Sequence, residues 1–111
     1  MYQPSEMAVL MQEFYDYNEQ LKKEITSGNE LTHMPETFKA IQTAEMTDSA
    51  DPSKIFKAYA PVYLQTQLRV TDSLNTEDLK TRFNDNINIC LSCHKTECVG
   101  PIPRIKKLLI Q

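Results

Sequence analysis

Glycine is scarce in this chain of 111 residues, which has only Gly28 and Gly100. Helix-forming residues dominate, and no segment shows the strict alternation of apolar and polar residues that is typical of a half-buried strand. An all-α fold is therefore predicted. The length is that of one domain, residues 1–111, with enough chain for a modest hydrophobic core.

Long hydrophobic runs and an excess of positive charge are also missing. The longest apolar run is far too short to cross a bilayer, so no membrane span is predicted. The net charge is −3, whereas a protein that binds nucleic acid needs a basic surface, and nucleic acid is therefore excluded as a partner. Residues 1–5 show neither a basic n-region nor an apolar h-region, so no targeting signal is visible.

Apolar residues recur at three- and four-residue steps in four segments, which predicts four helices. We expect the first to run from Pro4 to about Ser27 and a short second one to begin near Pro35. The third should span Asp51 to Val70, with Pro61 kinking or breaking it. The fourth should have Asn75 or Thr76 as its N-cap and end beyond His94.

Four helices with short connections and one apolar stripe each favour an antiparallel four-helix bundle. Residues 102–110 again have helical spacing after a turn rich in proline. They predict a short C-terminal helical extension that folds back on the bundle.

The sequence Cys90-Leu91-Ser92-Cys93-His94 lies within the last long helix. Its two cysteines and its histidine share one face of a helix. Two thiols so placed can add to the two vinyl groups on one edge of a haem, while the imidazole binds the iron. The C-x-x-C-H spacing is the attachment signature of c-type haem, so we expect one covalent haem c on Cys90 and Cys93, with His94 as proximal iron ligand.

Other interpretations of the same residues stay open. In one of them, Cys90 and Cys93 are small core residues and His94 lies on the helix surface. A zinc site made by these three residues and Cys98 supplies four suitable ligands, but their convergence on one ion is awkward on a continuous helix. A thioredoxin-like dithiol would need a βαβ context, which the pattern does not predict.

A helical chain of this size with one C-x-x-C-H in its last long helix resembles the cytochrome c′ and cytochrome c556 family, which is built on a four-helix bundle. In that family the first helix supplies the distal residue at the iron. This residue is a methionine in six-coordinate electron carriers, or an apolar residue in five-coordinate members that bind NO or CO. The resemblance implies Met11, preceded by Leu10, as the distal ligand, with Met7 as second choice.

Further expectations follow from the resemblance and from the departures from it. His33 and Met34 are reserve ligands on an exposed loop, and Arg82 or Arg104 is expected to meet the haem propionates. The aromatic residues expected around the macrocycle are Phe14, Tyr59, Tyr63 and Phe83.

Residues 95–111 extend beyond the point where family members usually end. This tail is expected to cover one edge of the haem. Cys98, within it, is expected to be a buried thiol, with an intermolecular disulfide as the alternative. The basic residues Arg104, Lys106 and Lys107 form either a solvated face or a docking patch for an acidic redox partner.

The sequence therefore predicts a monohaem c-type cytochrome that carries single electrons for an unidentified redox partner protein. A five-coordinate protein that binds NO or CO is the alternative. No general base, nucleophile or substrate cleft is evident, so an enzyme is not predicted. Because haem is attached to such motifs outside the cytoplasm, we expect a periplasmic or otherwise exported protein. The oligomeric state stays open, with a homodimer among the options.

Overall fold

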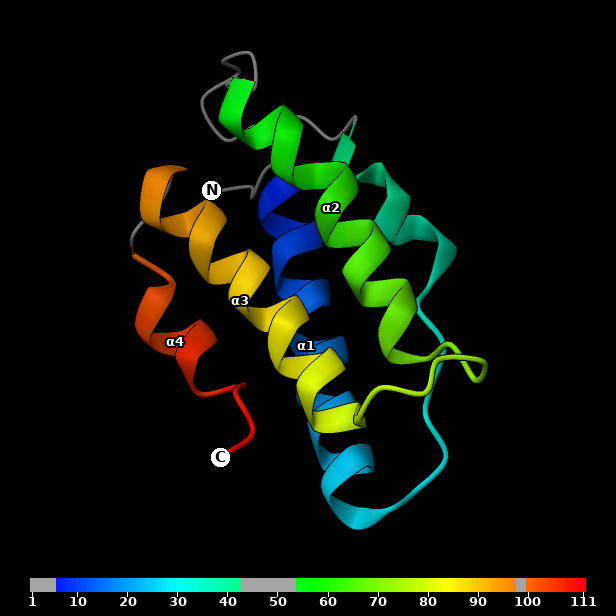
Figure 1. The fold of residues 1–111 in the computed structure, drawn as a ribbon. Helices are drawn as coiled ribbons and strands as arrows, with labels where there is room; N and C mark the ends of the chain where they lie inside the picture. The colour runs from blue at the N-terminus through cyan, green and yellow to red at the C-terminus, as the bar shows by residue number, and fades with distance from the viewer. Residues whose placement is uncertain (1–5, 43–53, 98–99) are drawn as a thin grey trace.

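The computed structural model describes residues 6–42, 54–97 and 100–111 (Figure 1). Every regular element in these residues is a helix, so the predicted all-α class is confirmed for them. The elements are α1 (Glu6–Ser27), the 3-10 helix η1 (Glu36–Gln42), α2 (Lys54–Val70), α3 (Leu79–Glu97) and α4 (Ile102–Lys106). The expected helix starts at Pro4 and Asp51 lie outside the described residues. So does Cys98, for which a buried thiol or an intermolecular disulfide is expected.

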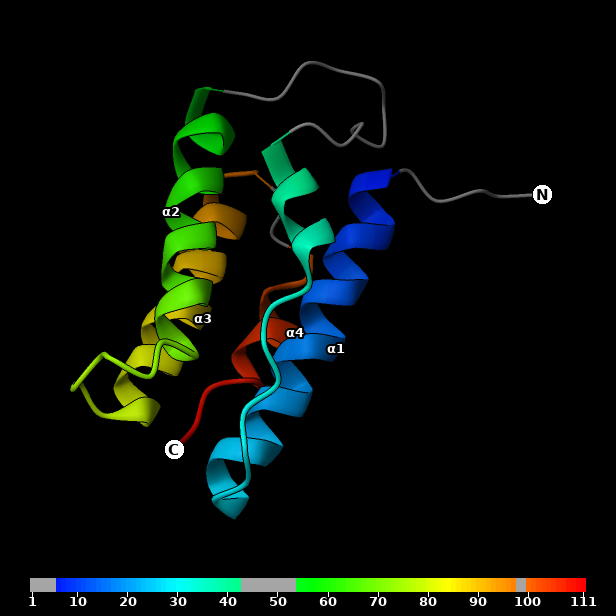
Figure 2. The ribbon, with the colours of Figure 1, turned by 90° about the vertical axis from the view of Figure 1, so that its right-hand side faces the viewer.

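The three long helices lie side by side, with α1 and α2 parallel and α3 antiparallel to both (Figures 1 and 2). The segment that follows α1 turns back along it and contains η1. The short α4 lies on the side of α3 away from α2. Among the described residues, no helix combines the length and the apolar character that spanning a membrane requires.

The second predicted helix is a short 3-10 helix, η1. Its two buried residues, Phe38 and Ile41, are three positions apart, which matches the three residues per turn of a 3-10 helix. The Phe38 amide donates to the Pro35 carbonyl oxygen at 3.1 Å and so begins this tighter winding.

The end of α1 agrees with its prediction at Ser27. Gly28 has a positive φ of 70°, the left-handed conformation that favours glycine at this position. The Asn29 amide donates to the Glu24 carbonyl at 2.9 Å, and the Gly28 amide donates to the Ile25 carbonyl at 3.3 Å. These two bonds form a Schellman cap, which turns the chain back toward η1.

Of the kink or break predicted at Pro61, the break is wrong, because α2 continues through this residue. Pro61 lies on the exposed side of the helix, as does Lys57 four residues earlier. Water can therefore satisfy the carbonyl that has lost its amide partner, and the helix tolerates the proline.

The start of α3 lies later than predicted. Asn75 accepts a bond from the Glu77 amide at 2.8 Å and so stabilises a turn, not the helix. The cap is Asp78, whose carboxylate accepts from the Thr81 amide at 3.2 Å. Each short polar side chain in this loop satisfies a nearby amide, and the sequence alone does not show which of them precedes the helix.

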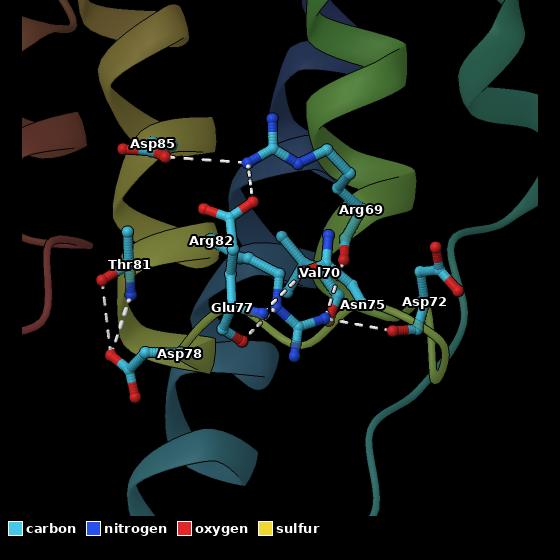
Figure 3. Close-up of polar contacts among 9 residues, drawn as sticks. All are labelled: Arg69, Val70, Asp72, Asn75, Glu77, Asp78, Thr81, Arg82 and Asp85. Carbon is cyan, nitrogen blue, oxygen red and sulfur yellow. Dashed lines mark hydrogen bonds and ion pairs between the residues drawn. The ribbon is translucent and has the colours of Figure 1, made fainter.

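The turn between α2 and α3 is held by the buried side chain of Arg82 (Figure 3). Its Nη1 donates to the carbonyl oxygens of Arg69, Val70 and Asp72 at 2.9, 3.1 and 3.1 Å, and its Nε donates to that of Glu77 at 3.0 Å. The guanidinium thus satisfies carbonyls at the C-terminus of α2, where a positive charge is also favourable.

The C-terminal segment packs on α1 and α3. The Lys22 ammonium donates to the carbonyls of Lys107 and Leu109 at 2.9 and 3.0 Å. Asn84 exchanges two bonds with the backbone of Ile110, at 2.8 and 2.9 Å. The predicted terminal helix is therefore shorter than expected, and side chains of α1 and α3 hold the residues that follow it.

Candidate cofactor site

An apolar cavity of about 30 Å³ lies among α1, η1, α2 and the C-terminal half of α3. All four elements supply its walls, and the lining combines sulfur-containing, aromatic and aliphatic side chains with a single histidine. The lining residues are Met11, Phe14, Ile41, Phe56, Tyr59, Ala60, Tyr63, Ile89, Cys90, Cys93 and His94.

The three reactive side chains of the C-x-x-C-H motif all line this cavity. Cys90, Cys93 and His94 lie on α3, which is a regular helix through the motif. Their common face is the consequence of helical spacing, as predicted, and it is turned toward α1 and α2. The structure therefore places two thiols and an imidazole beside one apolar space.

Met11 lines the cavity, whereas Met7 is not among the lining residues. Met7 is buried in the core, and Met11 is only partly buried. The structure therefore favours Met11 over Met7 as a partner for a group held in the cavity. Of the reserve ligands, His33 is exposed as expected, but Met34 is buried in the core, so the expectation for Met34 is wrong.

Three of the four aromatic residues expected at the site are there. Phe14, Tyr59 and Tyr63 line the cavity, but Phe83 does not. Phe83 lies on α3 two turns before Cys90, where it is completely buried in the core. An apolar stripe does not reveal at which level along a helix a cavity begins. The sequence therefore could not distinguish aromatic residues that line the cavity from one that packs in the core.

Four further lining residues were not predicted. These are Ile41, Phe56, Ala60 and Ile89. The presence of Phe56 and Ala60 could have been deduced from the spacing of α2, since they share a face with Tyr63 at steps of four and three. Nothing in the sequence indicates that η1 supplies Ile41.

Burial keeps two side chains of the cavity wall, Cys90 and Tyr63, protonated. Burial, followed by the proximity of Cys93, raises the pKa of the Cys90 thiol to about 12. Burial also raises the pKa of Tyr63 well above its usual value. The Tyr63 hydroxyl donates to Gln67 Oε1 at 2.8 Å. At neutral pH both groups are therefore neutral, as an apolar site requires.

The two arginines expected to bind the haem propionates, Arg82 and Arg104, lie in different parts of the structure. Arg82 donates to backbone carbonyls at the other end of α3, about 18 Å from His94 at 1.5 Å per residue, so that expectation is wrong. Arg104 is exposed, stacks over the Tyr15 ring at 3.9 Å and donates to Gln12 at 3.1 Å. Gln12 directly follows Met11, so Arg104 remains the candidate cation.

The C-terminal tail does not cover the cavity within the described residues. No residue of the segment 100–111 is among those that line it, and α4 packs on the other side of α3 (Figure 1). The described residues also contain no group of three or more His, Cys, Asp or Glu side chains able to hold a metal ion. The zinc interpretation therefore finds no support in them.

Comparison of the chain with protein-family models, with curated proteins and with solved structures finds no match. The chemistry of the site is therefore judged from its own residues. A c-type haem needs two cysteine thiols, one axial imidazole and an apolar enclosure, and the cavity has all three. The Met11 thioether in the same cavity would supply a sixth ligand, so the residues present fit this group.

Proposed function

We propose that this protein is a monohaem c-type cytochrome that carries single electrons. The observation that supports the proposal best is that Cys90, Cys93, His94 and Met11, from two different helices, line one apolar cavity. Cys90 and Cys93 would form the thioethers, His94 would be the proximal ligand and Met11 the distal one. A bound haem supplies the reversible one-electron chemistry of iron.

The protein's own residues would hold the iron and set its surroundings. Met11, as a thioether ligand, would raise the reduction potential relative to other axial partners. Phe14, Phe56 and Tyr63, which are all buried, would exclude water from the iron. Low polarity around the site would disfavour the ferric form, which carries one more positive charge than the ferrous form. It would therefore contribute to the reduction potential.

The cavity, at about 30 Å³, is too small for a macrocycle with the side chains placed as they are. Haem binding therefore requires side chains of the wall to move outward. Met11 and Tyr59 are partly exposed and can move without opening the core. Such movement is consistent with attachment before the helices have packed fully.

We further propose that the fold is a variant of the antiparallel four-helix bundle of the cytochrome c′ and c556 family. The helices α1, α2 and α3 would be three of its members. The segment 28–42, which runs back along α1, would take the place of the second helix although only η1 is wound (Figure 2). Covalent haem attachment also implies export, so we propose a periplasmic or equivalent location.

Expression of the exported protein together with a cytochrome c maturation system tests the proposal. The protein should carry haem that survives denaturing electrophoresis, and its oxidised form should be low-spin. The Cys90→Ser/Cys93→Ser double variant should lose this haem completely, whereas Cys98→Ser should retain it. A colourless wild-type protein would refute the function, and high-spin ferric iron would instead support the five-coordinate protein that binds NO or CO.

A further inference from the structure

A layer of buried amide side chains crosses the interior below the cavity. Asn18 on α1, Gln67 on α2 and Asn86 on α3 are at most 1% exposed; they are called the amide layer here. Asn18 and Gln67 exchange two hydrogen bonds of 3.0 Å. Asn86 Nδ2 donates to Gln67 Oε1 at 3.0 Å and to Asn18 Oδ1 at 3.4 Å. One layer thus joins all three long helices.

Neighbouring hydroxyl groups complete the hydrogen bonding of the amide layer at its edges. The Tyr63 hydroxyl donates to Gln67 at 2.8 Å, and the Thr66 hydroxyl donates to Asn86 Oδ1 at 2.7 Å. No buried side-chain nitrogen or oxygen among the described residues lacks a partner. A buried network of this kind tolerates one alignment of the helices, because any slip leaves several amides unpaired in an apolar interior.

The amide layer and the cavity are seven residues apart on every long helix. Seven residues toward the cavity from Asn18 is Met11; the same step from Gln67 is Ala60, and from Asn86 it is Cys93, followed directly by His94. All of these lie on the cavity wall. Seven residues are about 10.5 Å along a helix and return within about 20° to the same direction. The alignment at one level therefore fixes the alignment at the other.

We propose that Asn18, Gln67 and Asn86 are positioning residues that hold Met11 opposite His94 for axial coordination. This inference rests on the proposed function and adds how the distal ligand is placed. A slip of one turn between α1 and α3 would move Met11 by about 5.4 Å relative to His94. Such a shift is larger than the length of any metal–ligand bond, so the ligand would be lost. An apolar core alone fixes such register less strictly than a polar layer does.

The test compares two variants that both remove buried atoms. Asn86→Ala deletes one member of the amide layer, while Leu21→Ala deletes a completely buried side chain of α1 beyond it. Both should lower the midpoint of thermal unfolding. In the haem-loaded proteins, Asn86→Ala should raise the high-spin ferric fraction about fivefold or more, which corresponds to the loss of about one buried hydrogen bond. Leu21→Ala should keep the wild-type low-spin spectrum.

A second variant replaces the layer by apolar side chains, Asn18→Leu/Tyr63→Phe/Gln67→Met/Asn86→Leu. It should unfold at the wild-type temperature or above, because no polar atom is left unpaired, yet show mixed spin states in electron paramagnetic resonance.

A single low-spin species in this variant, or equal spectra for Asn86→Ala and Leu21→Ala, would overturn the inference and leave the proposed function intact. Absence of haem from the wild-type protein would instead refute the function on which the inference rests.

Discussion

The polar and reactive side chains at the two ends of α3 have different surroundings. At the N-terminal end, Arg82 satisfies four backbone carbonyls, and Arg69 pairs with Glu77 at 3.0 Å (Figure 3). At the C-terminal end, two thiols, an imidazole and a thioether face an apolar cavity. The first end consists of polar groups that pair with one another, and the second places thiols and an imidazole along the wall of an apolar cavity.

The difference shows which charged or sulfur-containing residues are structural. A buried polar group with every bond made has a sufficient reason to be where it is. Reactive side chains gathered from separate helices around one cavity suggest a ligand. By this criterion Arg82 belongs to the fold and Met11 belongs to the site, although the sequence offered both as partners of the haem.

The largest expected effect is at the cavity end. Met11→Ala should convert the oxidised, haem-loaded protein from low-spin to high-spin iron, because the variant lacks the proposed distal thioether. Electron paramagnetic resonance and the methionine–iron charge-transfer band measure the change. Met7→Leu preserves volume in the core and should leave both signals as in the wild type. A low-spin spectrum in Met11→Ala would move the distal ligand to another residue.

The next effect belongs to the polar end. Arg82→Ala should lower the free energy of unfolding by about 3 kcal/mol, because buried carbonyls lose a charged donor. Chemical denaturation measures the loss, and Arg69→Ala, which breaks an exposed pair, should cost less than about 1 kcal/mol. The haem spectrum should not change in either variant. A shifted spectrum in Arg82→Ala would show that the two ends are not independent.

A smaller effect is expected where α1 ends. Gly28→Ala should cost about 1–2 kcal/mol, because the positive φ of 70° is unfavourable for a residue with a Cβ atom. A Cβ at Gly28 would meet no atom within 4 Å, and the same holds for Gly100, which lacks a positive φ. Gly100→Ala is therefore the matched control and should be close to neutral. Equal losses in the two variants would contradict the backbone explanation.

The smallest effect concerns acid stability. Burial acts to raise the pKa of Glu24, but hydrogen bonds from the Thr32 amide, the Thr32 hydroxyl and Gln20 lower it below its ordinary value of 4.5. Because the folded pKa is depressed, this carboxylate stabilises the protein above the unfolded pKa, and the contribution disappears as the pH falls through the folded pKa.

The difference in unfolding midpoint between wild type and Glu24→Gln should therefore shrink between about pH 6 and about pH 3. Glu19→Gln on the same helix is the control, and it should show little difference at either pH. A constant gap for Glu24→Gln would show that the hydrogen bonds do not depend on its charge.

Much of the fold could be predicted from the sequence, because helical periodicity reports local structure. The ends at Ser27 and Val70, the apolar stripes and the common face of the C-x-x-C-H motif all follow from spacing of 3.6 residues. The 3-10 winding of η1, the tolerance of Pro61 and the late start of α3 depend on which atoms become exposed or bonded in three dimensions. Local propensity does not contain that information.

The candidate site likewise has features that the local sequence predicts and features that depend on the folded structure. Cys90, Cys93 and His94 are adjacent in the chain, so their pattern is legible in the sequence. The placement of Met11 on the same cavity depends on how α1 aligns with α3, and the burial of Asn18 and Asn86 reveals that alignment only in the folded molecule. Isolated polar residues on an apolar stripe are the signal in the sequence that indicates such a buried layer.

The central claim, that haem is joined covalently to α3, is tested most directly by mass spectrometry of a tryptic digest. The peptide of residues 83–95 contains Cys90, Cys93 and His94 and no other cysteine. After maturation in a competent host, this peptide should carry the mass of one haem and react with no alkylating reagent. An unmodified peptide that takes up two alkyl groups under the same conditions would contradict the claim.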